Sequence, residues 1–165
     1  MQSCGNQAPK PAHTDDEMIA AAKAVDVKFI EGMNKEDVGL VMSCYWNSPD
    51  LIVYPPDESE LKGYEASKES FTKFFAGTSG AKHEIVESNY KVAGDMVIGW
   101  GRVKMSVNGP DSTSPRIELN GRYTEVLAYK DSQLVYVVDH ASVALPPPPA
   151  GAAPPMAEEK EKAKK

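Results

Sequence analysis

The spacing of hydrophobic residues changes about halfway along this chain, from a helical period to strict alternation. Apolar positions recur every three or four residues from Met18 to Met33 and so share one face of a helix, which is expected to span about residues 15–32. Thr14 and Glu17 stand at the start of this stripe with the spacing of a capping box, in which each side chain bonds the other residue's backbone. The pattern predicts a long first helix.

Two shorter helices and a short strand are predicted next. Asn34 is expected to cap a second helix, whose apolar positions lie within residues 38–45. The apolar run 51–54 is predicted to be a strand that ends at two consecutive prolines. A third helix is expected over about residues 64–75, where three phenylalanines share one face.

The second half of the chain alternates between apolar and polar residues and predicts four long strands. Their expected ranges are 83–92, 96–107, 116–130 and 133–145. Polar and glycine-bearing turns separate them, so consecutive strands should pair antiparallel. Each strand exceeds the usual length of about five to six residues, which indicates a strongly curved sheet. The fold class is therefore α+β, with three N-terminal helices packed on one face of an antiparallel sheet.

Composition bounds the kind of protein and its partners. The chain has 165 residues, of which 41% are hydrophobic and 25% charged, which is typical of a single folded domain. We expect a flexible lead over residues 1–13, a domain over 14–145 and a disordered proline-rich, charged tail over 146–165. The net charge is −6 and the two end segments contribute +2, so the domain carries −8. An acidic domain argues against nucleic acid as a partner.

Cys4 is the residue that bears most on location. The start Met1-Gln-Ser-Cys-Gly-Asn, with a polar stretch after it, looks like the mature start of a bacterial lipoprotein, in which such a cysteine carries the lipid. If an export signal preceded Cys4, the protein would be an extracytoplasmic lipoprotein tethered to a membrane; otherwise it would be cytoplasmic. Both alternatives stay open, and Cys44, in an apolar helical stretch, is expected to be a core residue.

Four short motifs and the order of elements resemble the nuclear-transport-factor-2-like superfamily, and in particular its SnoaL-like branch, which is related to ketosteroid isomerases. The motifs are Trp46 to Pro55, Lys62-Gly-Tyr-Glu-Ala66, Gly121-Arg-Tyr-Thr124 and Asp139-His-Ala-Ser142. The resemblance spans about residues 15–145. It implies that the sheet curls into a cone around an apolar pocket and that the outer sheet face makes a homodimer.

The same resemblance bears on catalysis. Steroid isomerases of this superfamily use an aspartate base near the end of the first strand, where this chain has Tyr54 followed by two prolines and no carboxylate before Asp57. They also use a tyrosine hydroxyl from the first helix, where this chain has Phe29, which cannot donate a hydrogen bond. Both catalytic groups are absent from the matching positions, which argues against steroid isomerisation.

His140 is the candidate catalytic residue. If alternation continues along the last strand, Tyr136 and His140 share the pocket face and Asp139 points away. A histidine there can act as a base or orient a polar group of a ligand. The alternative is a buried histidine bonded to a cross-strand partner such as Thr124. The predicted ligand pocket consists of Trp46, Tyr54, Trp100, Tyr123, Tyr136 and His140.

Three functions follow from these observations. The first is a binding domain for a small apolar molecule, without catalysis or of unknown activity. The second is a polyketide-cyclase- or isomerase-like enzyme with His140 as base, and the third is a homodimerising interaction domain. We expect no cofactor and no metal, because His83, Glu84, Glu87 and His140 lack the spacing of metal ligands.

Overall fold

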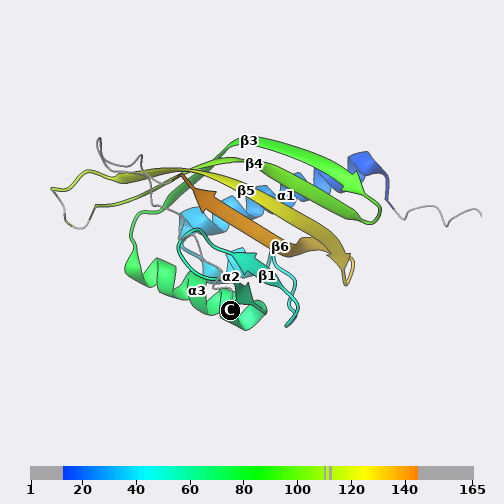
Figure 1. Cartoon of the computed structure of the whole chain (residues 1–165), viewed down its shortest axis with the longest axis horizontal. Coiled ribbons are helices and arrows are strands. Elements are labelled where there is room, and N and C mark those ends of the chain that lie inside the picture. Colours follow the sequence, from blue (N-terminus) through cyan, green and yellow to red (C-terminus); the bar gives the residue numbers. More distant parts are fainter. Residues whose placement is uncertain (1–12, 110, 112, 145–165) are drawn as a thin grey trace, which may run out of the picture.

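The computed structural model describes residues 13–109, 111 and 113–144. The predictions for Cys4, for the lead and for the tail after residue 145 lie outside these residues. In chain order the elements are α1 (Asp15–Lys35), α2 (Val38–Met42), β1 (Ile52–Tyr54), β2 (Leu61–Lys62), α3 (Tyr64–Gly77), β3 (Lys82–Ala93), β4 (Met96–Val107), β5 (Ile117–Lys130) and β6 (Gln133–Val143) (Figure 1). The α+β class, with three helices and one sheet, is confirmed.

The start of α1 is as predicted, and its end is later than predicted. Thr14 and Glu17 form the capping box. The helix continues through Lys35, and Asn34 does not cap α2; instead its side chain donates to the backbone oxygen of His83 at 3.1 Å and accepts from its N–H at 2.6 Å. Asn34 therefore ties the end of α1 to the start of β3.

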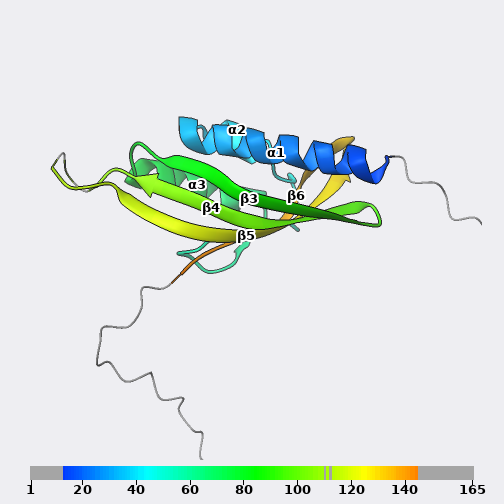
Figure 2. The same ribbon diagram turned by 90° about the horizontal axis from the view of Figure 1, so that it is seen from above.

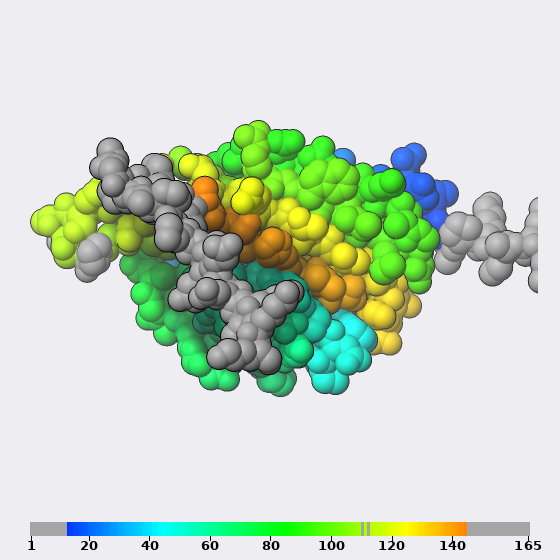
Figure 3. Space-filling model, in the orientation of Figure 1, coloured from blue at the N-terminus to red at the C-terminus, as the bar shows by residue number. Residues whose placement is uncertain are grey.

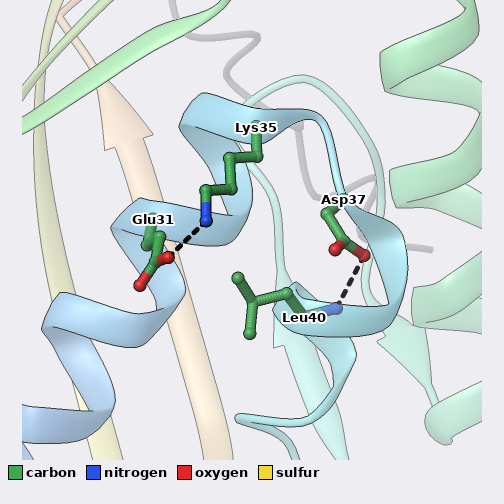
Figure 4. A network of polar contacts seen from close by, with 4 residues as sticks. All are labelled: Glu31, Lys35, Asp37 and Leu40. Carbon is green, nitrogen blue, oxygen red and sulfur yellow. Dashed lines mark hydrogen bonds and ion pairs between the residues drawn. The ribbon is translucent and has the colours of Figure 1, made fainter.

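Asp37 is the residue that begins α2. Its side chain accepts from the N–H of Leu40 at 2.9 Å, while Lys35 and Glu31 form an ion pair at 2.5 Å on the last turn of α1 (Figure 4). A carboxylate at a helix N-terminus satisfies an otherwise free N–H and suits the helix dipole. The two helices therefore meet at a tight corner.

The sheet has six strands in the order β2-β1-β6-β5-β4-β3 and is mixed. The long strands β3 to β6 pair antiparallel, as predicted. The prediction of a purely antiparallel sheet is wrong, because β1 pairs parallel with β6. Hairpins force antiparallel pairing only between consecutive strands, and β1 joins the sheet beside a strand that follows it by about 80 residues.

The helix α1 runs along one face of the sheet, which we call the inner face (Figure 2). Figure 3 shows the opposite, outer face, where β4, β5 and β6 form exposed bands. The core between α1, α2 and the inner face consists of fully buried side chains that include Val41, Met42, Leu51, Val97 and Leu127. Cys44 belongs to this core, as predicted, and burial raises the pKa of its thiol to about 11.

Candidate functional site

A cavity of about 540 Å³ lies between the inner sheet face, α1, α3 and the loop after β1. Glu125, which is 4% exposed, lies near one end, and Leu119, which is 43% exposed, lies at the other. Both are on β5, six residues apart, which corresponds to about 20 Å along a strand. The cavity is therefore elongated, with an open mouth near Leu119 and a closed end near Glu125.

A β-bulge in β6 determines which residues face this cavity. Val138 pairs with Val126, whereas Tyr136 pairs with Leu127, so Val137 is an extra residue without a partner position in β5. The extra residue shifts the alternation by one position, because side chains on a strand change face at every residue. After the bulge Asp139, Ala141 and Val143 line the cavity.

His140 consequently lies on the outer face of the sheet. It is exposed, its cross-strand neighbour Thr124 is exposed, and its ring lies 6.2 Å from that of Tyr54 on the neighbouring strand β1. The expectation that Tyr136 and His140 share the pocket face is wrong for this reason. Asp139, which was expected to point away from the pocket, takes that position.

The structure brings some of the other predicted pocket residues together. Tyr123 and Tyr136 line the cavity, and Tyr54 borders it while its ring lies beside His140. Trp100 does not, because it lies on the outer face and is 42% exposed. Trp46 lies outside the cavity as well, beneath the ammonium group of Lys130, which is 4.3 Å from the ring centre. The homodimer through the outer face stays a prediction.

The closed end of the cavity holds three carboxyl groups, from Asp26 of α1, Glu125 of β5 and Asp139 of β6. Asp26 accepts hydrogen bonds from the hydroxyl groups of Tyr90 and Tyr136, the latter at 2.7 Å. Asp139 accepts one from Tyr45 at 2.6 Å. Glu125 and Asp139 occupy paired positions on adjacent strands. Sequence reasoning missed all three residues as a site.

Two glycines of β4 make room for this cluster. A Cβ atom on Gly99 would lie 2.3 Å from Oε1 of Glu125, and one on Gly101 would lie 2.9 Å from the ring of Tyr123. Glycine inside a strand often marks such a close approach. The Gly-Trp-Gly segment of β4 is thus the sequence signal that matches the buried glutamate, together with Asp26 inside the apolar stripe of α1.

Asp26 and Glu125 differ in their tendency to hold a proton. Burial raises the pKa of both carboxyl groups, and the charge of Asp26 raises the pKa of Glu125 further. The hydroxyl groups of Tyr90 and Tyr136 oppose this shift at Asp26, because hydrogen bonds to a carboxylate favour its ionised form. We therefore assign the proton to Glu125 and the negative charge to Asp26 at neutral pH.

Polar atoms without partners also face the cavity. Within the described part of the chain, Oε1 of Glu125, the hydroxyl of Tyr123 and Nδ1 of His83 are buried and have no hydrogen-bond partner. Buried polar atoms are nearly always bonded, so such atoms call for a ligand or water. His83 lies toward the mouth, and burial lowers its pKa to about 4, so its ring is neutral.

Asp139 is poised to titrate near neutral pH. Burial raises its pKa to about 6, while the hydrogen bond from Tyr45 acts in the opposite direction. In the Tyr45→Phe variant we expect the pKa of Asp139 to rise further, because its carboxylate loses the bond that stabilises it. Carbon-13 NMR titration of the aspartate side chains measures this shift, and an unchanged or lower pKa would contradict the assignment.

The described residues offer no sign of a metal site or of a membrane-spanning helix. No group of three or more His, Cys, Asp or Glu side chains among them has the geometry to hold a metal ion. His83 lines the cavity, whereas Glu87 bonds Arg102 at 2.8 Å and His140 is exposed on the outer face, so these residues are not brought together. No helix in the same part of the chain is long and apolar enough to cross a bilayer.

Comparison with known proteins identifies one family model and several solved structures that are similar to this chain. The family model described as a SnoaL-like domain matches residues 16–146. Among curated proteins, none matches. Among solved structures, a nuclear transport factor 2-like superfamily protein from Salmonella enterica superimposes with a TM-score of 0.72 at 13% identity, covering 84% of this chain and 99% of that one.

Two further structures share the fold at low identity. A type 2 hexachlorocyclohexane dehydrochlorinase has a TM-score of 0.67 at 20% identity, covering 84% of this chain and 95% of that one. An uncharacterised protein with a cystatin-like fold from Caulobacter vibrioides has a TM-score of 0.67 at 15% identity, covering 79% and 92%. At these identities the likeness concerns the fold.

Proposed function

This chain belongs to the SnoaL-like domain family of the nuclear-transport-factor-2-like superfamily, and we propose that it binds an elongated, largely apolar small molecule in its cavity. The observation that carries the proposal is a cavity of about 540 Å³ whose lining is mostly apolar and which has three carboxyl groups at its closed end. Small-molecule sites combine apolar walls with a few polar groups that fix orientation. The polar end of the ligand would lie near Glu125.

The wall residue Ala141 allows a direct test. It lines the middle of the cavity on β6, between Asp139 and Val143. An Ala141→Phe substitution should fill this space and abolish the rise in melting temperature that a bound apolar compound causes. Thermal unfolding with a panel of elongated apolar compounds measures this effect.

His140 supplies the matched control. The His140→Ala variant changes the neighbouring residue of the same strand on the outer face, so it should keep the shift. Loss of the shift in His140→Ala, or its retention in Ala141→Phe, would contradict binding in the cavity. Absence of a shift with every compound in the wild type would reject the proposed function.

A second candidate is an enzyme that transfers protons at the closed end. It is favoured by one observation, which is that Asp139, with a pKa of about 6, lies beside Glu125, whose pKa burial raises. Two carboxyl groups held in different protonation states can act as base and acid. A dehydrochlorinase among the structures of the same fold is consistent with elimination chemistry. This candidate replaces His140 with Asp139 as the base.

The pH dependence of turnover tests the second candidate. With Asp139 as base, the rate should fall on the acid side of a pKa near 6. The Tyr45→Phe variant should move this limb to higher pH, since it raises the pKa of Asp139. A limb that stays in place would exclude Asp139 as the base.

A further inference from the structure

Among the described residues, the charged side chains at the closed end of the cavity are all carboxyl groups. Three carboxyl groups meet there, and Lys73 is the one lysine or arginine side chain of the described residues that lines the cavity. Lys73 lies on α3, is exposed, and pairs with Glu69 at 2.7 Å. The buried carboxyl groups therefore have no cationic partner within the described part of the protein, although buried charges in proteins are normally paired.

The unpartnered atoms at this end are suited to a donor. Glu125 is 4% exposed, and its Oε1 atom has no hydrogen-bond partner among the described residues. With its proton directed to Asp26, the glutamate offers an acceptor, and the carboxylate of Asp139 offers others. A ligand head group that donates several hydrogen bonds and accepts none matches this set, and an ammonium group has three donors.

Phe29 and Tyr136 line the cavity near the same end, and the ring of Tyr45 packs against both. The rings of Phe29, Tyr45 and Tyr136 form a cluster with centroids 5.2, 5.9 and 6.0 Å apart. Tyr45 bonds Asp139 and Tyr136 bonds Asp26, so the rings and the carboxyl groups form one unit. The faces of aromatic rings attract cations, and the attraction grows when the cation is removed from water.

The walls toward the mouth are mostly apolar along β3 to β6 and fit an extended hydrocarbon, while exposed Asp57, Glu58 and Lys73 lie on the side of the loop after β1 and α3. The apolar walls include Ile85, Val103, Met105, Leu119 and Val143. An anionic head group would meet like charge at the closed end, and a neutral alcohol would leave the carboxylates without a counter-charge. A cation attached to an apolar chain satisfies both ends of the cavity.

We propose that the cavity binds a lipophilic amine, with its ammonium group among Asp26, Glu125 and Asp139 and its chain directed along β5 toward Leu119. This inference rests on the proposed function and specifies the class of ligand that the cavity accepts. Binding of the cation would favour the ionised form of Glu125, so the complex should release a proton to the buffer.

Calorimetric titration of the full chain at pH 8 with octylamine, 1-octanol and octanoate tests the inference, because the three compounds have eight carbon atoms each and differ chiefly in the charge of the head group. Octylamine should bind at least about tenfold more tightly than either other compound. The heat of octylamine binding should also differ between phosphate and Tris buffers, as proton release requires. Glu125→Gln and Asp139→Asn should each weaken octylamine binding about tenfold and weaken octanol binding by clearly less, because octanol carries no charge to pair with the carboxylates.

Glu118→Gln is the control for net charge. It removes one carboxylate from the same strand as Glu125, but Glu118 is exposed and pairs with Lys104 at 3.2 Å outside the cavity. Octylamine binding should be unchanged in this variant. Equal or tighter binding of octanol or octanoate to the wild type overturns the amine inference while the proposed function stands. Failure of all three compounds, and of the wider apolar panel, overturns both.

Discussion

The Glu125→Gln variant should be more stable than the wild type at pH 8, by about 3 kcal/mol or more. Glu125 is buried beside Asp26, and burial raises its pKa far above the ordinary value. The folded chain therefore binds a proton that the unfolded chain releases, and the free energy of unfolding falls as pH rises above the ordinary glutamate pKa. The slope for one proton is about 1.4 kcal/mol per pH unit.

Glutamine should remove this loss without disturbing the packing. Its amide has the size of a protonated carboxyl group and can donate to Asp26 as the acid does. Urea unfolding at intervals from pH 5 to pH 9 should show a steep decline for the wild type and a flatter curve for Glu125→Gln. Glu118→Gln, which loses an exposed ion pair, should follow the wild-type curve within about 1 kcal/mol. A variant less stable than the wild type across this range would mean that Glu125 is ionised in the folded state.

Much of this fold could be predicted because local signals and burial agree. The capping residues Thr14 and Glu17 mark the start of α1, and the alternation along residues 117–129 correctly separates the two faces of β5. Glu125 is one of the residues on the apolar side of that alternation. A carboxyl group in such a position is a signal for a site, as is Asp26 within the apolar stripe of α1.

The face of β6 could not be predicted in the same way. Alternation assigns Tyr136 and His140 to one face, and a single extra residue, Val137, reverses the assignment after it. Nothing in the apolar run of β6 distinguishes the bulged residue from its neighbours, because the bulge is fixed by pairing with β5 and by α1 and α2 packed on the inner face. The prediction of the cavity-facing residues is therefore off by one position after the bulge, so that Asp139 faces the cavity where His140 was expected.

The cluster of carboxyl groups also depends on the geometry of strands β3 and β4. A second irregularity lies in β3, where the pairing with β4 shifts between Ile85 and Glu87. The carbonyl group of Glu87 thereby comes close to Gly101. Since the inner face at Gly101 also carries the ring of Tyr123, this position combines a backbone constraint with a cavity wall.

Gly101→Ala should therefore destabilise the domain by about 3 kcal/mol and lower its melting temperature by roughly 10 °C. The added Cβ would lie 1.9 Å from the carbonyl oxygen of Glu87, and a backbone atom cannot turn aside as a flexible side chain can. Relief requires β3 and β4 to separate locally, which weakens the pairing beside the cavity. Chemical unfolding monitored by circular dichroism measures the loss.

Gly77→Ala is the matched substitution, because a Cβ at Gly77, at the end of α3, meets nothing within 4 Å. It should leave stability unchanged or raise it by about 0.5–1 kcal/mol, since alanine favours a helix over glycine. If Gly101→Ala proved as stable as Gly77→Ala, this result would contradict the close approach of the Glu87 carbonyl group to Gly101. It would also contradict the placement of Tyr123 in the cavity wall. A large loss confined to Gly101→Ala would support the close approach of the Glu87 carbonyl group to Gly101, and with it a cavity wall at Tyr123 that depends on the bulge in β3.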